Sequence, residues 1–359
     1  MYLDRLHIHN VRNLQDLELT CSPQFNLIYG ENGSGKTSFL EAIHILLLGR
    51  SFRSHIKSRL IHHAADNLSV FAELQSFERC SLSVGIQKFI SGNTQLRLNG
   101  QEISAIAEII ALLPTQLLNP DSFELINTGS KLRRQFIDWG LFHVKPEFYP
   151  LWAKTERILK QRNAALRQQL PRNEISVWDE ELNELAIALN TMRFEYMQDL
   201  LPIVTELSEP FVDFPKVDIT YHPGWDIDKS LIVQLSHSLS QDLQRGYTRL
   251  GPQRASIRIE SNNQPAHDIL SRGQQKILIF IMRFAQAALL HRQTGKACLF
   301  LIDDLTSELD SGRRQQLIQV IKQQAGQFFI TSLELQDLLI FKEMPHSKMF
   351  HVKQGKIEI

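Results

Sequence analysis

The sequence contains little cysteine, and its few cysteines form no pattern. Cys21, Cys80 and Cys298 are the three cysteines among 359 residues, and they lie far apart. A disulfide framework needs paired cysteines and a structural zinc site needs closely spaced ligands, so both classes are excluded. We therefore expect a protein of a reducing compartment, the cytoplasm.

Long apolar runs and an excess of one charge are also missing. No segment reaches the roughly 18 apolar residues of a membrane span, and the first residues lack the basic head and apolar core of a secretory signal. The 39 Lys and Arg residues balance 39 Asp and Glu residues. We expect a soluble protein without a membrane partner, in which any nucleic-acid surface comes from local clusters of charge.

Apolar patterning predicts an α/β fold in three regions. Residues 1–120 read mostly as strands, with one helix that follows a glycine loop and stops at Gly49. Residues 121–245 read as long helices, and residues 246–359 return to alternating strands and helices. The pattern predicts a parallel-sheet head built from both chain termini, with a helical lobe inserted between them.

Heptad spacing indicates a helical hairpin in the inserted lobe. The second predicted helix carries apolar or aromatic residues at Trp178, Leu182, Leu185, Leu189, Met192 and Tyr196. Upstream, Trp152, Leu159 and Leu166 repeat every seven residues, and a turn is expected around Pro171. Two amphipathic helices inside a larger helical lobe would give the same pattern, because the heptads are few.

The segment GENGSGKT carries the clearest chemistry. It matches G-x-x-x-x-G-K-[ST] at every fixed position, between a predicted strand and a predicted helix. Glycines let successive backbone N–H groups face phosphates, the lysine reaches the β- and γ-phosphates, and the threonine hydroxyl can bind Mg²⁺. This P-loop predicts an ATP site formed by Gly30, Glu31, Asn32, Gly33, Ser34, Gly35, Lys36 and Thr37.

Two acids end a strongly apolar strand near the C-terminus. The sequence LFLIDD places Asp303 and Asp304 where ligands bind in open α/β sheets. We expect Asp303 to hold Mg²⁺ through a water, and Asp304 to orient or deprotonate the attacking water. With Lys36, they belong to the predicted catalytic set.

The signature segment, Leu270–Lys276, reads LSRGQQK and opens another helix. Ser271 and Gln274 form an S-x-x-Q capping box, and free N–H groups at a helix N-terminus favour a bound anion. Because the P-loop already supplies one phosphate site, two such elements indicate a nucleotide held between two protein surfaces.

The order of these motifs, followed by SELD at 307–310, resembles the ABC-type ATPase superfamily. The resemblance implies that Ser271 and Gly273 bind the γ-phosphate in trans, so that ATP joins a homodimer. It also implies that Gln116 is the glutamine that senses the γ-phosphate and the metal, and that Gln116 completes the predicted catalytic set. The predicted fold class is accordingly an α/β P-loop head of ABC type with an inserted helical lobe.

Several longer stretches are similar to the bacterial RecF family, among them DRLHIHNVRNL, LNPDSFELINTGSKLRRQFIDWGLFHV and GPQR. Members are DNA-repair ATPases with an SMC-like head and a short arm. The resemblance implies binding to single-strand/double-strand DNA junctions, ATP-dependent dimerisation, and loading of RecA with RecO and RecR in replication, recombination and the SOS response. It also places Arg12, in the early FRN-like motif, at the nucleotide.

The chain departs from the family pattern at three points. Val11 stands where an aromatic residue is common, and Gln253 stands where many relatives carry histidine. Thr331 and Ser332 follow the strand after which transporter ATPases place a switch histidine. With one polarising group absent, we predict a slow, DNA-stimulated ATPase that acts as a clamp.

Local basic clusters favour DNA binding without sequence readout, because phosphate contacts need only positive charge. Solvated helix faces with acids nearby would give the same clusters. The predicted DNA contacts are Arg53, Lys57, Arg59, Arg133, Arg134, Arg157, Arg162 and Arg167. A nucleotide-binding subunit of an ABC transporter shares the ATPase motifs and is the alternative function.

Overall fold

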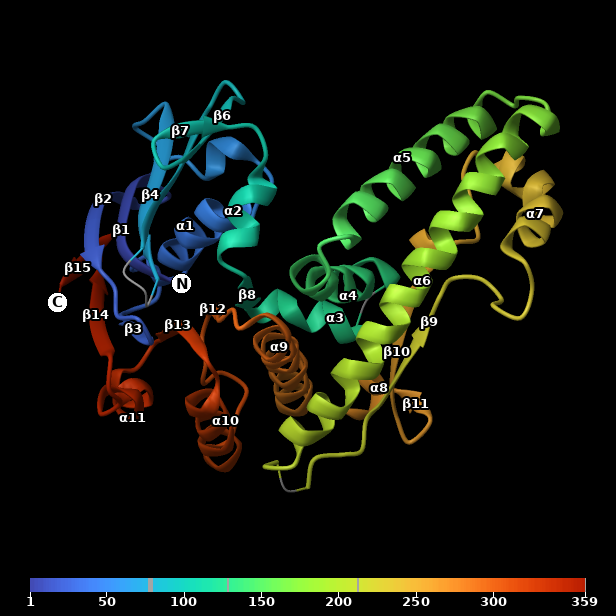
Figure 1. Ribbon diagram of the computed structural model, residues 1–359. Coiled ribbons are helices and arrows are strands. Elements are labelled where there is room, and N and C mark those ends of the chain that lie inside the picture. The colour runs from blue at the N-terminus through green and yellow to red at the C-terminus, as the bar shows by residue number, and fades with distance from the viewer. Residues whose placement is uncertain (77–79, 128, 212, 359) are drawn as a thin grey trace. The chain divides into compact units, whose positions relative to one another are not determined.

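The computed structural model describes residues 1–76, 80–127, 129–211 and 213–358, and the side chain of Lys57 is also outside the described part. The chain forms two compact units (Figure 1). The first contains Met1–Ser122 and Thr294–Ile359, and the second contains Phe123–Gln293. Among the described residues no helix is long and apolar enough to cross a membrane.

The first unit is built around a mainly parallel sheet of order β15-β14-β3-β13-β12-β8. Four of its strands are nearly fully buried because their sequences are apolar runs, as expected for parallel strands covered on both faces. Its strands are β3 (Phe25–Tyr29), β8 (Thr115–Leu118), β12 (Cys298–Ile302), β13 (Gly326–Ser332), β14 (Ser347–Lys353) and β15 (Lys356–Glu358). The sheet joins both ends of the chain, as predicted.

An antiparallel sheet of order β2-β1-β4-β5-β6-β7 completes this unit. Its strands alternate buried and exposed residues, which places one face on the core. They are β1 (Tyr2–Val11), β2 (Leu14–Thr20), β4 (Asn67–Gln75), β5 (Ser81–Phe89), β6 (Thr94–Leu98) and β7 (Gln101–Ile103).

Helix α1 (Lys36–Leu48) is the centre of the first unit's core. It buries ten of its 13 residues and shares one apolar cluster with strands of both sheets. Gly49 ends it in the left-handed conformation at φ 69°, as the sequence predicts. The remaining helical segments are η1 (Lys57–Arg59), α2 (Ile106–Leu112), η2 (Pro120–Phe123), α10 (Ser311–Gln323), η4 (Leu335–Leu338) and α11 (Leu339–Lys342).

The second unit is mainly helical. Its helices are α3 (Glu124–Asn127), α4 (Ser130–Val144), α5 (Phe148–Arg167), α6 (Arg172–Ser208), α7 (Leu231–Arg245), η3 (Pro252–Arg254), α8 (Ala266–Ile269) and α9 (Arg272–Thr294). A small antiparallel sheet contains β9 (Asp218–His222), β10 (Ser256–Ser261) and β11 (Gln264–Pro265).

The predicted hairpin forms between α5 and α6, but it is not a free two-helix arm. Leu231 and Leu235 of α7 join the apolar cluster of Ile158, Leu182 and Leu185 on the hairpin helices. Three helices therefore share this core, which agrees with the alternative of a larger helical lobe.

The helical unit extends beyond the predicted boundary at residue 245. Residues 246–293 belong to it rather than to the head. On α9, the buried Gln286 side chain donates to the Phe136 carbonyl oxygen at 2.6 Å and to the Tyr196 hydroxyl at 3.2 Å. The signature helix thus packs on α4 and α6. These contacts join residues far apart in the sequence, so the local apolar pattern does not predict them.

Candidate functional site

The P-loop connects β3 to α1 through a strained turn. Gly33 and Gly35 have φ values of 76° and 123°, which glycine adopts readily and other residues do not. Two neighbouring turns hold the loop by the carbonyl oxygen of Ser34, which accepts from the Asn13 side chain at 3.2 Å and from the Gly355 N–H at 2.8 Å. These bonds hold the phosphate-binding backbone to the β1–β2 and β14–β15 turns.

Lys36 and Thr37, at the end of the P-loop, supply its ammonium group and its hydroxyl group. The Lys36 ammonium donates to the carbonyl oxygens of Gly30 at 2.6 Å and Glu31 at 2.9 Å, so it curls back over the loop. The Thr37 hydroxyl donates to Asp303 Oδ1 at 3.2 Å. Thr37 and Asp303 are 266 residues apart in sequence, and the order of the parallel strands brings them together.

Burial perturbs both charged groups of this site. It lowers the pKa of the Lys36 ammonium, and the nearby carboxylates of Asp303 and Asp304 oppose the change. It raises the pKa of Asp303, against hydrogen bonds from the Thr331 and Thr37 hydroxyls. Such paired shifts are typical of functional sites, because a bound cation or anion would relieve them.

Arg12 reaches the pocket from the turn between β1 and β2. Its Nε and Nη2 groups donate to the two oxygens of Glu41 at 2.9 and 2.8 Å, and its Nη1 donates to the Arg59 carbonyl oxygen at 2.5 Å. Glu41 is fully buried on α1 and also accepts from the Ser51 hydroxyl. A guanidinium has five N–H groups, so this arrangement leaves two for a ligand.

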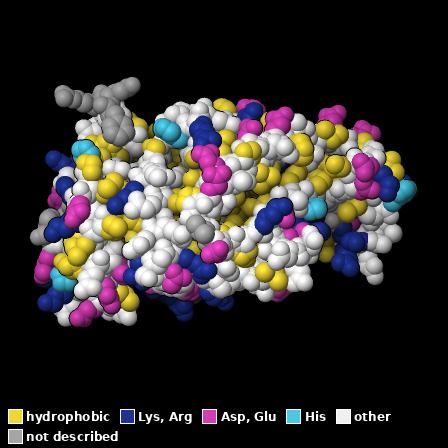
Figure 2. All heavy atoms as spheres, turned by 90° about the horizontal axis from the view of Figure 1, so that it is seen from below, with side chains coloured by type: hydrophobic (Ala, Val, Ile, Leu, Met, Phe, Trp, Pro, Cys, Tyr) yellow, Lys and Arg dark blue, Asp and Glu magenta, His cyan; other side chains and the backbone are white. Residues whose placement is uncertain are grey.

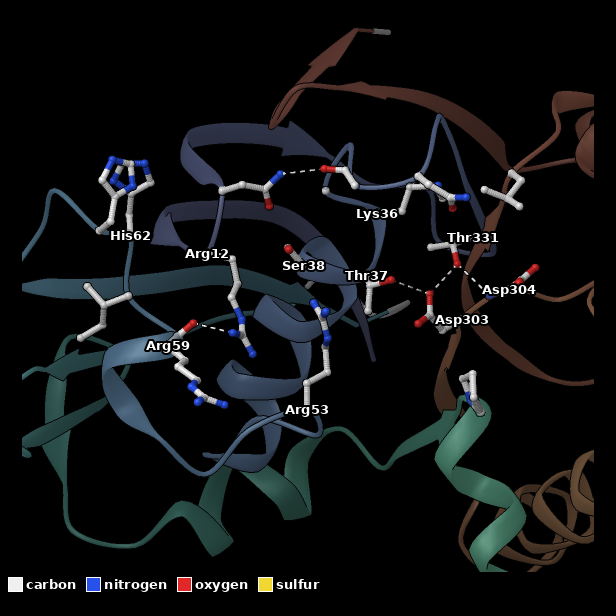
Figure 3. Close-up of a pocket in the computed structure, with 18 of the residues that line it drawn as sticks. Arg12, Lys36, Thr37, Ser38, Arg53, Arg59, His62, Asp303, Asp304 and Thr331 are labelled. Carbon is white, nitrogen blue, oxygen red and sulfur yellow. Dashed lines mark hydrogen bonds between the residues drawn. The ribbon is translucent and has the colours of Figure 1, made fainter.

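These groups line one pocket of about 820 Å³. Figure 3 shows Lys36, Thr37 and the acid pair at one end, Arg12 and His62 towards the other, and Arg53 between them, beside Thr37. Cation donors therefore face a carboxylate pair across a volume suited to a nucleotide.

The signature segment lies in the other compact unit and has the predicted capping box. The Gln274 N–H donates to Ser271 Oγ at 3.3 Å, and the Ser271 N–H donates to the Gln274 side chain at 2.9 Å. Ser271 is exposed, and its hydroxyl proton stays available to a phosphate. Gly273 lies in the first turn, where backbone N–H groups have no acceptor within the helix.

The structure corrects the prediction for Gln116. Its side chain is 2% exposed within β8, beside Phe300 of β12, and it is absent from the pocket lining. The carboxyl end of β8 comes two residues later, at Leu118. A γ-phosphate or metal contact would need a residue at that end.

Three predicted DNA contacts are engaged inside the second unit. Arg162 is fully buried, where it pairs with Asp179 at 2.6 Å and with Asp242 at 2.9 Å. Arg133 and Arg134 are half-buried and donate to backbone carbonyl oxygens. The prediction for Arg162 is wrong, because its charge is buried in ion pairs of the fold, whereas the half-buried Arg133 and Arg134 stay predictions.

The other predicted DNA contacts divide into two groups. Arg53 and Arg59 are exposed but line the nucleotide pocket, while the side chain of Lys57 lies outside the described part. Arg157 and Arg167 are exposed on α5. They remain the candidates for a DNA surface.

Asn13 and Glu41 are site residues that carry no predicted role in the sequence, and the contacts of Thr331 with the acid pair were not predicted either. The sequence carries no signal for Glu41, because it is a single acid within a mostly apolar helix and its partners are brought to it by tertiary packing. Asn13 follows Arg12 directly, and that adjacency is the signal that could have identified it.

Comparison with known proteins agrees with this geometry. The model of the RecF/RecN/SMC N terminal domain family matches residues 2–358. The DNA replication and repair protein RecF of Haemophilus ducreyi is 42% identical over 360 residues, which cover 100% of both chains. That of Shewanella piezotolerans is 40% identical over 359 residues, covering 100% of this chain and 99% of the relative.

Solved structures show the same fold. The structure of the recombination mediator protein RecF-ATP in the RecFOR pathway matches with a TM-score of 0.86 at 24% identity, covering 99% of this chain and 97% of that chain. An Smc head bound to the C-winged helix domain of ScpA matches with a TM-score of 0.64 at 15% identity, covering 100% and 96%. The predicted fold class and family are confirmed, and the chain belongs to the RecF family of DNA replication and repair proteins.

Proposed function

We propose that the chain is an ATP-dependent DNA-binding protein of recombinational repair and replication, and that ATP closes it into a homodimer. The observation that carries the proposal is the convergence of Thr37 and Asp303 at 3.2 Å in a P-loop pocket. The capped signature helix supplies a second, exposed phosphate-binding element on the other unit.

The pocket's donor set fits ATP with Mg²⁺. The hydroxyl of Thr37 and the carboxylate of Asp303 are hard oxygen ligands, and Mg²⁺ is usually held by one or two such groups together with phosphate oxygens. Bound there, Mg²⁺ would neutralise charge on the β- and γ-phosphates. Lys36 would bind the same oxygens, while Asp304 would orient the attacking water.

Dimerisation follows from the signature helix. A γ-phosphate held by one subunit's P-loop would accept from Ser271 and from the N–H of Gly273 of the second subunit. Each subunit then completes the other's site, and hydrolysis releases the pair. Thr331 and Ser332 replace a switch histidine, which supports slow turnover suited to a clamp.

DNA binding rests on the exposed cations of α5, Arg157 and Arg167. On the face drawn in Figure 2, Lys and Arg side chains are interspersed with Asp and Glu, without a single broad basic surface. The exposed cations of α5 favour sequence-independent phosphate contacts. By family resemblance, the DNA bound would be a junction between single- and double-stranded segments. By family resemblance, RecO and RecR would cooperate with the protein to load RecA in the cytoplasm.

A transporter subunit is the alternative with the same ATPase motifs. The full-length match to proteins named RecF and the absence of the switch histidine both favour the repair function over it.

Size-exclusion chromatography with gapped DNA tests the proposal. We expect ATP with Mg²⁺ to convert the wild-type protein to a dimer that binds the DNA. Ser271→Arg should abolish the dimer while ATP still binds at Lys36, and Ser176→Arg, an exposed serine on α6, should dimerise normally. A dimer formed by Ser271→Arg would contradict the role of the signature helix.

A further inference from the structure

Thr331 stands where transporter ATPases carry their switch histidine, and it is tied to both acids of the site. It is the penultimate residue of β13 and is 1% exposed. The parallel register pairs Ile330 with Ile302, so Thr331 follows directly beside Asp303. Figure 3 shows the Thr331 hydroxyl between the two carboxylate-bearing residues.

The hydroxyl of Thr331 makes two short bonds of opposite sense. It accepts from the Asp304 N–H at 2.9 Å. It has a single proton, and Asp303 Oδ1 at 2.9 Å is a nearer and stronger acceptor for it than the Ile302 carbonyl oxygen at 3.4 Å. One side chain therefore holds the backbone of one acid and the carboxylate of the other.

The backbone of Thr331 extends this control to the next residue. Its carbonyl oxygen accepts from the Leu305 N–H at 3.2 Å. Asp304 lies between these two bonds with a φ of 57°, in the left-handed region that residues with a Cβ rarely adopt. A conformation of this kind persists where its surroundings enforce it, and Thr331 supplies the enforcing bonds.

Asp303 is fixed from two sides. The hydroxyls of Thr37 and Thr331 both donate to Oδ1, so the plane of the carboxylate is set by one residue of α1 and one of β13. Removing the Thr331 hydroxyl would take one of two hydroxyl donors from the Asp303 carboxylate and would take the acceptor from the Asp304 N–H.

We propose that Thr331 is a positioning residue for ATP hydrolysis, which orients Asp303 and Asp304 without itself binding the nucleotide. The inference rests on the proposed ATPase function. At this position the chain carries a group that holds the acid pair, in place of a histidine that would contact the γ-phosphate.

The test compares Thr331→Val, which removes only the hydroxyl, with Thr331→Ser, which keeps it. We expect Thr331→Val to lower kcat by about 10-fold or more, since small misplacement of reacting groups is costly. Its Kd for ATP and its ATP-dependent dimerisation should stay within about twofold of wild type. Thr331→Ser should restore kcat.

A second readout needs no nucleotide. In Thr331→Val, the Asp304 amide loses its acceptor, whereas the Leu305 amide keeps the Thr331 carbonyl oxygen. Amide hydrogen exchange should therefore accelerate at Asp304 and remain slow at Leu305. Thr331→Ala provides the same comparison if the valine methyl crowds Asp303 and lowers the melting temperature.

Three results for Thr331→Val would overturn the inference. They are an unchanged kcat, a loss of ATP affinity as large as the loss of kcat, and an unchanged rate of amide exchange at Asp304. A wild-type protein that binds no ATP would instead refute the proposed function, and the inference with it. Exchange at Asp304 separates the two cases, because it reports the contact whether or not the chain hydrolyses ATP.

Discussion

Replacing Arg12 with alanine probes the buried ion pair behind the nucleotide pocket. The change removes two charge-assisted bonds to Glu41, at 2.9 and 2.8 Å, and one to the Arg59 carbonyl oxygen. Glu41, fully buried, would keep the Ser51 hydroxyl and Arg53, whose Nη1 is 3.8 Å away, as its partners among the described residues. Breaking a buried pair from one side usually costs 3–5 kcal/mol, and the remaining partners place this case near the lower end, at about 3 kcal/mol.

The second change, Glu41→Gln, separates charge from packing. In the Arg12→Ala background it removes the uncompensated carboxylate, so the double variant should be more stable than Arg12→Ala alone, by about 1–2 kcal/mol. Affinity for ATP should stay low in both variants, because the two remaining N–H groups of Arg12 are lost in each.

Urea denaturation followed by two probes provides the assay. All four tryptophans, Trp139, Trp152, Trp178 and Trp225, belong to the helical unit, so their fluorescence reports on that unit alone. Far-ultraviolet circular dichroism reports on both units. Arg12→Ala should move the dichroism transition to lower urea and leave the tryptophan transition in place.

The matched control is Arg5→Ala on β1, the strand that leads into the turn with Arg12. Arg5 is exposed and lies 3.8 Å from Glu73, a surface pair worth under about 1 kcal/mol. An Arg12→Ala variant that is as stable as Arg5→Ala, or a double variant with Glu41→Gln that is less stable than Arg12→Ala, would contradict the role of this ion pair.

Three further predictions concern buried and exposed cations. His44 is buried, and burial lowers its pKa to about 4 from 6.5. Because the unfolded chain therefore takes up the proton first, the free energy of unfolding should fall by up to about 3 kcal/mol as the pH drops from 6.5 to 4. In urea denaturation measured across this pH range, His44→Gln should reduce that fall. Arg162→Met leaves two carboxylates buried without their partner, so it should lower the free energy of unfolding by about 4 kcal/mol in the transition detected by tryptophan fluorescence. Arg157→Met, at an exposed position on the same helix, should have little effect. Equal effects of the two changes would contradict the burial of Arg162. Arg157→Glu with Arg167→Glu should weaken DNA binding and reduce its salt slope by about two, and unchanged titrations would remove α5 from the interface.

Much of the site was readable because its signals are local. A P-loop needs glycines, lysine and threonine at fixed spacing between a strand and a helix, and a capping box needs serine and glutamine three residues apart. The structure has these elements at Lys36, Gly49, Ser271 and Gln274 where the sequence predicts them. Short-range geometry alone decides such features.

The basic residues were not all assigned correctly from the local sequence pattern. Arg157 and Arg162 are five positions apart on one helix, yet one is exposed and the other is fully buried between two aspartates. Arg162 lies three residues after Leu159 and four before Leu166, on the buried face of α5, but its partners Asp179 and Asp242 come from α6 and α7 and are supplied only by tertiary packing. In the sequence Gln116 likewise looks like a polar residue that could contact a nucleotide, but in the structure it is buried within the sheet.

The sequence by itself determined the nucleotide chemistry, the order of the motifs and the α/β class, because each depends on residue type and spacing along the chain. Tertiary structure decided which charges serve the fold and which remain for ligands, and it placed the signature helix in the helical unit. It also assembled Arg12 with Glu41 and Thr331 with the acid pair. Those partners are 27 to 29 residues apart in sequence, so only the packed sheets and helices could bring them into contact.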